Sequence, residues 1–264
     1  MSLRETTRSI IALVEEMSGF PVLVSEDPSL QTLAVVRMAR GGASAHTISY
    51  KLSPGTQPDY LIACQCGFIL RHFAPPPDQR FDLAAAKTGR DIVGRLLSDP
   101  GGPPSKLKLP PSARERLRDQ LFDGLMLQLR SIPVGLRVDA WILDTYPDLA
   151  PLQRISVLQQ LQENQAALGP DVRKIAPRKI YGASVAMNAA FAAFWTRAFD
   201  DLALSLPYRT AGYEKTGREL LKLFDESPTE PSHDRDLIDV WGNHLSLSSW
   251  YQWIPSTVGK PAAA

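Results

Sequence analysis

The chain has 264 residues, with 29 lysines and arginines against 28 aspartates and glutamates, and apolar residues make up 44% of it. This is the composition of a globular protein that is long enough to bury a core without disulfides or metals. The formal charge of +1 supplies no global field to attract nucleic acid or an anionic membrane. Binding of nucleic acid is therefore not favoured.

The cysteines and the apolar segments indicate a cytoplasmic protein. Cys64 and Cys66 lie two residues apart, which does not fit a disulfide framework and is typical of a reducing compartment. Glu15 and Glu16 interrupt the apolar stretch near the N-terminus, which a signal peptide would not tolerate. The apolar stretch 183–195 is too short to span a bilayer, so we expect no membrane association.

Residues 1–98 carry signals of both helix and strand. Apolar residues recur at helical spacing over residues 4–18, and Gly19 predicts the end of that helix. Short runs rich in valine or in alternating residues predict three strands, over Pro21–Ser25, Leu33–Met38 and His46–Leu52. Because Gly41 and Gly42 separate the last two runs, we expect a small sheet that includes an antiparallel hairpin.

An unusually apolar segment follows, from Tyr60 to Phe73. Thr56 can cap a helix here, Pro58 suits its first turn, and the prolines at 75–77 end it. We therefore expect a buried helix over this segment. A further helix is expected over Phe81–Leu97.

The character of the sequence changes after a stretch rich in proline and glycine at 99–111, which predicts a linker. Long segments of 3.6-residue period then predict helices over 112–131, 149–168, 181–204, 214–225 and 233–246. We therefore expect a helix-rich α+β protein. It would comprise an α+β domain at 1–98, a helical domain at 112–254 and a flexible tail at 255–264.

The apolar helix contains the most informative motif. Zinc peptidases carry the pattern HExxH, in which two histidines four residues apart share a helix face and the glutamate polarises the metal-bound water. Cys64 and Phe68 occupy the two histidine positions here, and Gln65 occupies the glutamate position. The sequence therefore keeps the spacing of the motif but has residues of different chemistry at its three positions.

This helix resembles the HExxH helix of the IrrE/ImmA-type metallopeptidase-like domain, which reads roughly LAHELGHxLLH. Residues Ile62–His72 give the same frame, with Gly67 and His72 in register. The order of one helix, three short strands and two helices is similar too, so the resemblance covers about residues 1–98. It implies a zincin-like minimal domain and a setting among bacterial stress-response, prophage or toxin–antitoxin regulators.

The departures from that family imply that zinc hydrolysis is lost. The family takes its third ligand from a glutamate on the following helix, and Thr88 lies near that register. A phenyl ring such as that of Phe68 cannot bind a metal, and the Gln65 amide cannot act as a general base near neutral pH. The resemblance thus implies a degenerate metallopeptidase, and we expect neither a metal nor another cofactor.

Two alternatives remain open from the sequence. The segment could be an ordinary core helix in which small residues allow close packing. It could instead belong to an enzyme, either a metallopeptidase with other ligands or a hydrolase that uses Cys64 as a thiol nucleophile beside His46 or His72. Cys64 and Cys66 would point in different directions on a helix, so they would not converge on one metal.

The favoured hypothesis is a non-catalytic scaffold or regulatory subunit that recognises a protein partner. All five tryptophans lie after the linker, and exposed aromatic rings commonly dominate binding energy. Trp250 and Trp253 are the candidates for a partner-binding surface, because Leu245–Ser249 breaks the helical period just before them. The alternative is that this segment folds back and seals the core.

Overall fold

The computed structural model describes residues 3–40, 42–53, 56–86, 88–99 and 109–256, and all elements named below lie within these ranges. The chain begins with helix α1 (Glu5–Ser18), strands β1 (Val22–Glu26), β2 (Ala34–Arg37) and β3 (His46–Tyr50), and helix α2 (Asp59–Phe73). These elements confirm the helix, the three strands and the apolar helix expected from the sequence. Gly19 ends α1 in the left-handed conformation, with φ of 75°.

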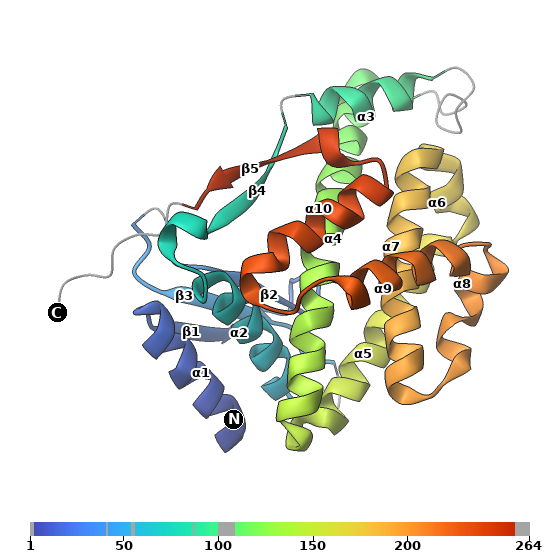
Figure 1. Cartoon of the computed structure of the whole chain (residues 1–264). Coiled ribbons are helices and arrows are strands. Elements are labelled where there is room, and N and C mark those ends of the chain that lie inside the picture. The colour runs from blue at the N-terminus through green and yellow to red at the C-terminus, as the bar shows by residue number, and fades with distance from the viewer. Residues whose placement is uncertain (1–2, 41, 54–55, 87, 100–108, 257–264) are drawn as a thin grey trace.

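The three strands form a mixed sheet in the order β1-β3-β2 (Figure 1). β2 pairs with β3 in antiparallel register, which confirms the expected hairpin, and β1 pairs with β3 in parallel register. The expected cap at Thr56 is wrong, because the Thr56 hydroxyl donates to the carbonyl of Ser53 at 2.6 Å and Pro58 precedes the first turn of α2.

The helix expected over Phe81–Leu97 is wrong in its first part. Residues Phe81–Ala85 form strand β4, and helix α3 covers only Gly89–Ser98. β4 pairs in antiparallel register with β5 (Tyr251–Pro255), a strand that was not expected from the sequence. This pairing joins segments from the two predicted domains, and most of the predicted linker, 100–108, lies outside the described residues.

The remaining elements are helices: α4 (Pro111–Thr145), α5 (Ala150–Gln165), α6 (Pro170–Ile175), α7 (Arg178–Phe199), α8 (Leu206–Thr210), α9 (Glu214–Glu226) and α10 (Asp234–His244). The helical character of the second half is confirmed, so the fold is α+β and helix-rich. α4 does not stop at residue 131 but continues through the buried Pro133. Packing on several sides of α4 outweighs the hydrogen bond that the proline removes.

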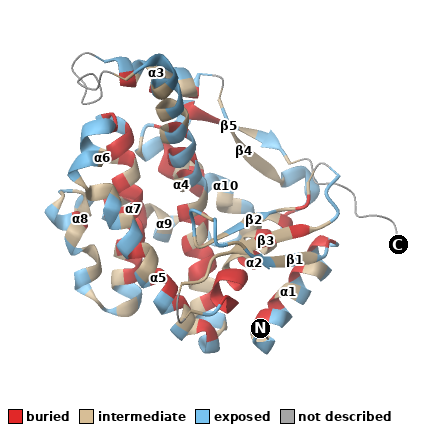
Figure 2. Ribbon diagram, turned by 180° about the vertical axis from the view of Figure 1, so that it is seen from behind, coloured by how far each residue is buried: buried red, intermediate tan, exposed pale blue. Residues whose placement is uncertain are grey.

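α4 is the central element of the molecule. Helices α2, α3, α7 and α10 all pack against it, and Figure 1 shows it running between the N-terminal sheet and the helices α5 to α9. Buried residues follow α4 and α7 where these helices face their neighbours (Figure 2). No helix in the described part of the chain is long and apolar enough to cross a membrane.

Candidate functional site

A cavity of about 790 Å³ lies beside α2. Its walls come from β2, α2, the middle of α4, α5, β4 and α10. The volume lies within the range of roughly 300–1,000 Å³ that is typical of ligand pockets. Because β4 and α10 lie far apart in the sequence, only the folded chain assembles this cavity.

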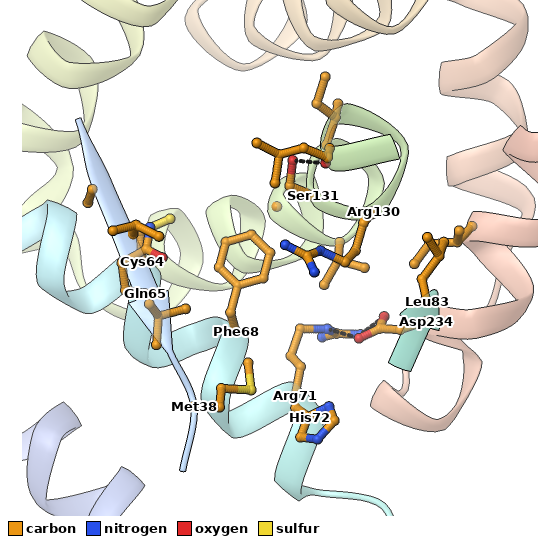
Figure 3. A pocket seen from close by; sticks show the side chains of 18 of the residues that line it. Met38, Cys64, Gln65, Phe68, Arg71, His72, Leu83, Arg130, Ser131 and Asp234 are labelled. Atoms are coloured by element: carbon orange, nitrogen blue, oxygen red, sulfur yellow. Dashed lines mark hydrogen bonds and ion pairs between the residues drawn. The ribbon is translucent and has the colours of Figure 1, made fainter. Parts of the chain in front are cut away.

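The three motif residues of α2 share the face that lines the cavity. Cys64, Gln65 and Phe68 are half-buried and all border it, and Figure 3 shows the Phe68 ring directed inward. Cys66 is fully buried in the core and does not line the cavity. The two thiols therefore point in different directions, as the helical spacing predicts.

A buried polar cluster lies in the cavity wall beside Cys64. The Tyr60 hydroxyl donates to Asp139 Oδ1 at 2.6 Å, and the Gln153 amide donates to the Asp139 backbone carbonyl at 3.0 Å. Burial raises the pKa of the Asp139 carboxyl to about 7, although both partners oppose this shift. Burial, with the charge of Asp139, also raises the pKa of the Cys64 thiol well above its usual range.

The two histidines considered as partners of Cys64 lie elsewhere. His46 is fully buried, where its Nδ1 accepts from the Ala39 amide at 3.0 Å and its Nε2 lies 3.0 Å from Ser18 Oγ. His72 lies eight residues beyond Cys64 on the same helix, an axial distance of about 12 Å. The geometry therefore brings neither ring to the thiol, and a thiol with a raised pKa is a poor nucleophile at neutral pH.

The cavity residues do not fit a zinc ion. Thr88 is exposed at the start of α3 and does not line the cavity, so the expectation that it shares a site with Cys64 and Phe68 is wrong. The residues Phe81–Ala85, expected to begin the helix that follows α2, form strand β4 instead, so α3 begins only at Gly89. Within the described ranges, no three histidine, cysteine or acidic side chains are grouped so that they could hold a metal ion.

Ion pairs tie the cavity walls together. Arg71 of α2 donates from Nε and Nη2 to both carboxylate oxygens of Asp234, each at 2.8 Å (Figure 3). The buried Arg137 of α4 pairs with the same carboxylate at 2.5 Å and also donates to the carbonyl of Pro228. Helices α2, α4 and α10 are thereby held at fixed positions around the cavity.

A second group of charges lies between the end of α2 and the start of β4. Arg40 pairs with Asp82 at 2.6 Å, and Arg80 donates to the backbone carbonyls of Phe73 and Pro75. Arg130 projects from α4 into the cavity opposite Phe68 (Figure 3). Arg130 makes no hydrogen bond or ion pair with any residue that the structure describes.

The tryptophans proposed as a binding surface have different environments. Trp250 is fully buried and stacks on Phe122, so the expectation that it lies at the surface is wrong. It caps the core where α3, α4 and β5 meet. Trp253 is half-buried at the edge of the cavity, and its indole N–H donates to Asp239 at 2.8 Å.

No protein-family model, curated protein or solved structure matches the chain. Cys64, Gln65 and Phe68, which the sequence singled out, line the cavity, but nothing in the sequence indicated Arg130 and Asp139 of α4. Their signal was weak, because charged residues occur all around this long helix and only the packing of α4 selects those that face the cavity.

Proposed function

We propose that the chain is a non-catalytic, metallopeptidase-like protein that acts as a scaffold or regulatory subunit by holding an extended segment of a protein partner in the cavity. The observation that carries this proposal is the position of the edge strand β2. All eight residues of the stretch 31–38 line the cavity, and β3 is the strand that pairs with β2 in the described part of the chain. An extended peptide can add to such an edge as a further strand.

The backbone register indicates which groups of β2 are available. The Lys51 amide donates to the Leu33 carbonyl at 2.8 Å, and hydrogen-bonded pairs alternate along an antiparallel ladder. Val35 therefore directs its backbone groups toward β3. Ala34 and Val36 direct theirs toward the free edge, where a bound segment would find donors and acceptors.

The replaced motif supports binding rather than hydrolysis. Phe68 stands at one ligand position and has no metal-binding atom, and Gln65 stands at the position of the base and cannot accept a proton near neutral pH. Cys64 stands at the other ligand position, where burial raises the pKa of its thiol and keeps it protonated. Phe68 instead gives the cavity an apolar wall. Side chains of the bound segment can be buried against such a wall while its backbone pairs with β2.

The test begins with a displayed library of random ten-residue peptides, selected on the purified full chain. The affinity of a selected peptide is then measured for the wild type, Val36→Pro and Val36→Thr. Proline removes the amide that faces the free edge, so we expect Val36→Pro to weaken binding about tenfold. Val36→Thr keeps the amide and the β-branched shape and should bind within about twofold of the wild type.

Circular dichroism and thermal melting of both variants separate loss of binding from loss of folding. Equal affinity of Val36→Pro and Val36→Thr would contradict the proposal, provided that both are folded. The proposal would also be contradicted if the selection yielded no peptide that binds in the cavity. A small molecule found to occupy the cavity in purified protein would favour a ligand-binding function instead.

A further inference from the structure

One end of the cavity carries an excess of positive charge. Arg40, Arg80 and Arg130 line it where α2 ends and β4 begins, and among the described residues Asp82 is the carboxylate whose charge acts on this group. Burial, followed by the charge of Arg40, lowers the pKa of the nearby His72 to about 4, so this ring is neutral near pH 7. Three guanidinium groups thus border this end of the cavity, and the carboxylate of Asp82 acts on two of them, Arg40 and Arg130.

Two of these arginines have unused hydrogen-bonding capacity. Arg130 is exposed to solvent and has no hydrogen-bond or ion-pair partner among the described residues, so its guanidinium is open to a ligand. Arg40 uses Nη1 for its ion pair with Asp82, but its Nε is buried and lacks an acceptor. The buried Nε of Arg40 is destabilising without an acceptor, and guanidinium groups such as those of Arg40 and Arg130 bind carboxylate or phosphate oxygens best.

The side chains around Arg130 indicate which groups would lie next to a bound anion. The guanidinium faces the Phe68 ring, and Met38 lies on the same side of the cavity (Figure 3). An anionic group bound by Arg130 would therefore have apolar side chains as neighbours. The free edge of β2 runs along the same cavity, so one extended segment can reach both.

We infer that Arg130, together with Arg40, forms a subsite for one anionic side chain of the bound segment. The anion is either the carboxylate of an acidic residue or the phosphate of a phosphorylated one, because both present oxygens to the two guanidinium groups. This inference rests on the proposed function and adds to it the chemistry of the segment: an extended peptide with an acidic residue among apolar ones.

The test is a position scan of the selected peptide, in which each residue is replaced in turn by Glu, Gln or phosphoserine. At one position, we expect Glu or phosphoserine to bind the wild type at least about tenfold more tightly than Gln. In Arg130→Gln, the three peptides should bind within about twofold of one another. The tighter of the two anions identifies whether the segment carries a carboxylate or a phosphate.

Arg37→Gln is the matched control, since Arg37 lies on β2, lines the same cavity and carries the same charge. The advantage of the anion should persist in this variant. An advantage that persists in Arg130→Gln, or that Arg37→Gln removes equally, would overturn the subsite. Binding that depends on Val36 but shows no preference for an anion overturns the subsite alone, whereas the absence of any selected peptide overturns the proposed function too.

Discussion

The Asp139 carboxyl is a buried group in the cavity wall whose titration makes stability depend on pH. Its folded pKa of about 7 lies above the value of about 3.9 expected in the unfolded chain. Between these values the folded protein holds a proton that the unfolded chain releases, so the free energy of unfolding falls as the pH rises. The neutral His46, whose pKa is lowered to about 4 by burial, acts oppositely, since its stabilising effect is lost as the pH falls from about 6.5 to 4.

Comparison with Asp139→Asn isolates the contribution of the carboxyl. Asparagine has nearly the same size and can accept the hydrogen bond from Tyr60, but it does not titrate. Relative to this variant, the wild type should lose roughly 2–3 kcal/mol between pH 5 and pH 8, at about 1.4 kcal/mol per pKa unit. Urea unfolding at several pH values measures the difference, and a difference that is constant with pH would contradict the assignment.

Trp250 is predicted to stabilise the fold. The ring is fully buried against Phe122, so Trp250→Ala should cost about 3–5 kcal/mol of unfolding free energy. Trp253→Ala is the comparison, and it should cost less because Trp253 is only half-buried. Chemical denaturation of both variants checks this order. Equal stability of Trp250→Ala and the wild type would contradict the burial of Trp250 against Phe122.

At the scale of elements, the approach of α2 to α4 depends on a residue without a side chain. A Cβ atom at Gly67 would lie 2.4 Å from Cγ1 of Val138, closer than van der Waals contact allows. Gly67→Ala should therefore destabilise the protein, although alanine gains about 1 kcal/mol in helix propensity. A loss of stability in Gly67→Ala would thus indicate close packing of α2 on α4, whereas a gain would indicate an ordinary helical position.

A double-mutant cycle shows whether the clash is with Val138. Val138→Ala alone should cost stability because it leaves a cavity, but in the Gly67→Ala background it should cost less or even stabilise. Thermal unfolding of the four proteins gives the interaction energy between the two sites. Additive effects of the two substitutions would contradict the packing described for α2 and α4.

Elements with strong local signals were predictable from the sequence. The Gly19 stop and the prolines at 75–77 delimit α1 and α2, and the alternation of valines indicates the strands. β4 was not predictable, because its partner β5 lies at the other end of the chain and strand propensity depends on such a partner. The candidate cavity was half predictable: α2 supplied Cys64, Gln65 and Phe68, whereas the residues from α4 depend on tertiary packing.

At the scale of the whole molecule, contacts cross the predicted boundary between the domains. β4 pairs with β5, and Asp234 of α10 binds Arg71 of α2 and the buried Arg137 of α4. Breaking a buried ion pair by separating its members is costly, so the first part of the chain has little freedom to unfold alone. We therefore expect residues 1–98 and the helices of the second half to unfold together.

Two probes from opposite parts of the chain test this expectation. Cys66 is fully buried in the first part, and all five tryptophans lie in the second. In Cys64→Ser, which leaves Cys66 as the single thiol, its reactivity toward a disulfide reagent should appear at the urea concentration at which tryptophan fluorescence changes. Coincident midpoints would indicate one cooperative unit that keeps the cavity walls together. A thiol that becomes reactive at lower urea would instead support two separately folding domains, and the cavity would then open before the helical part unfolds.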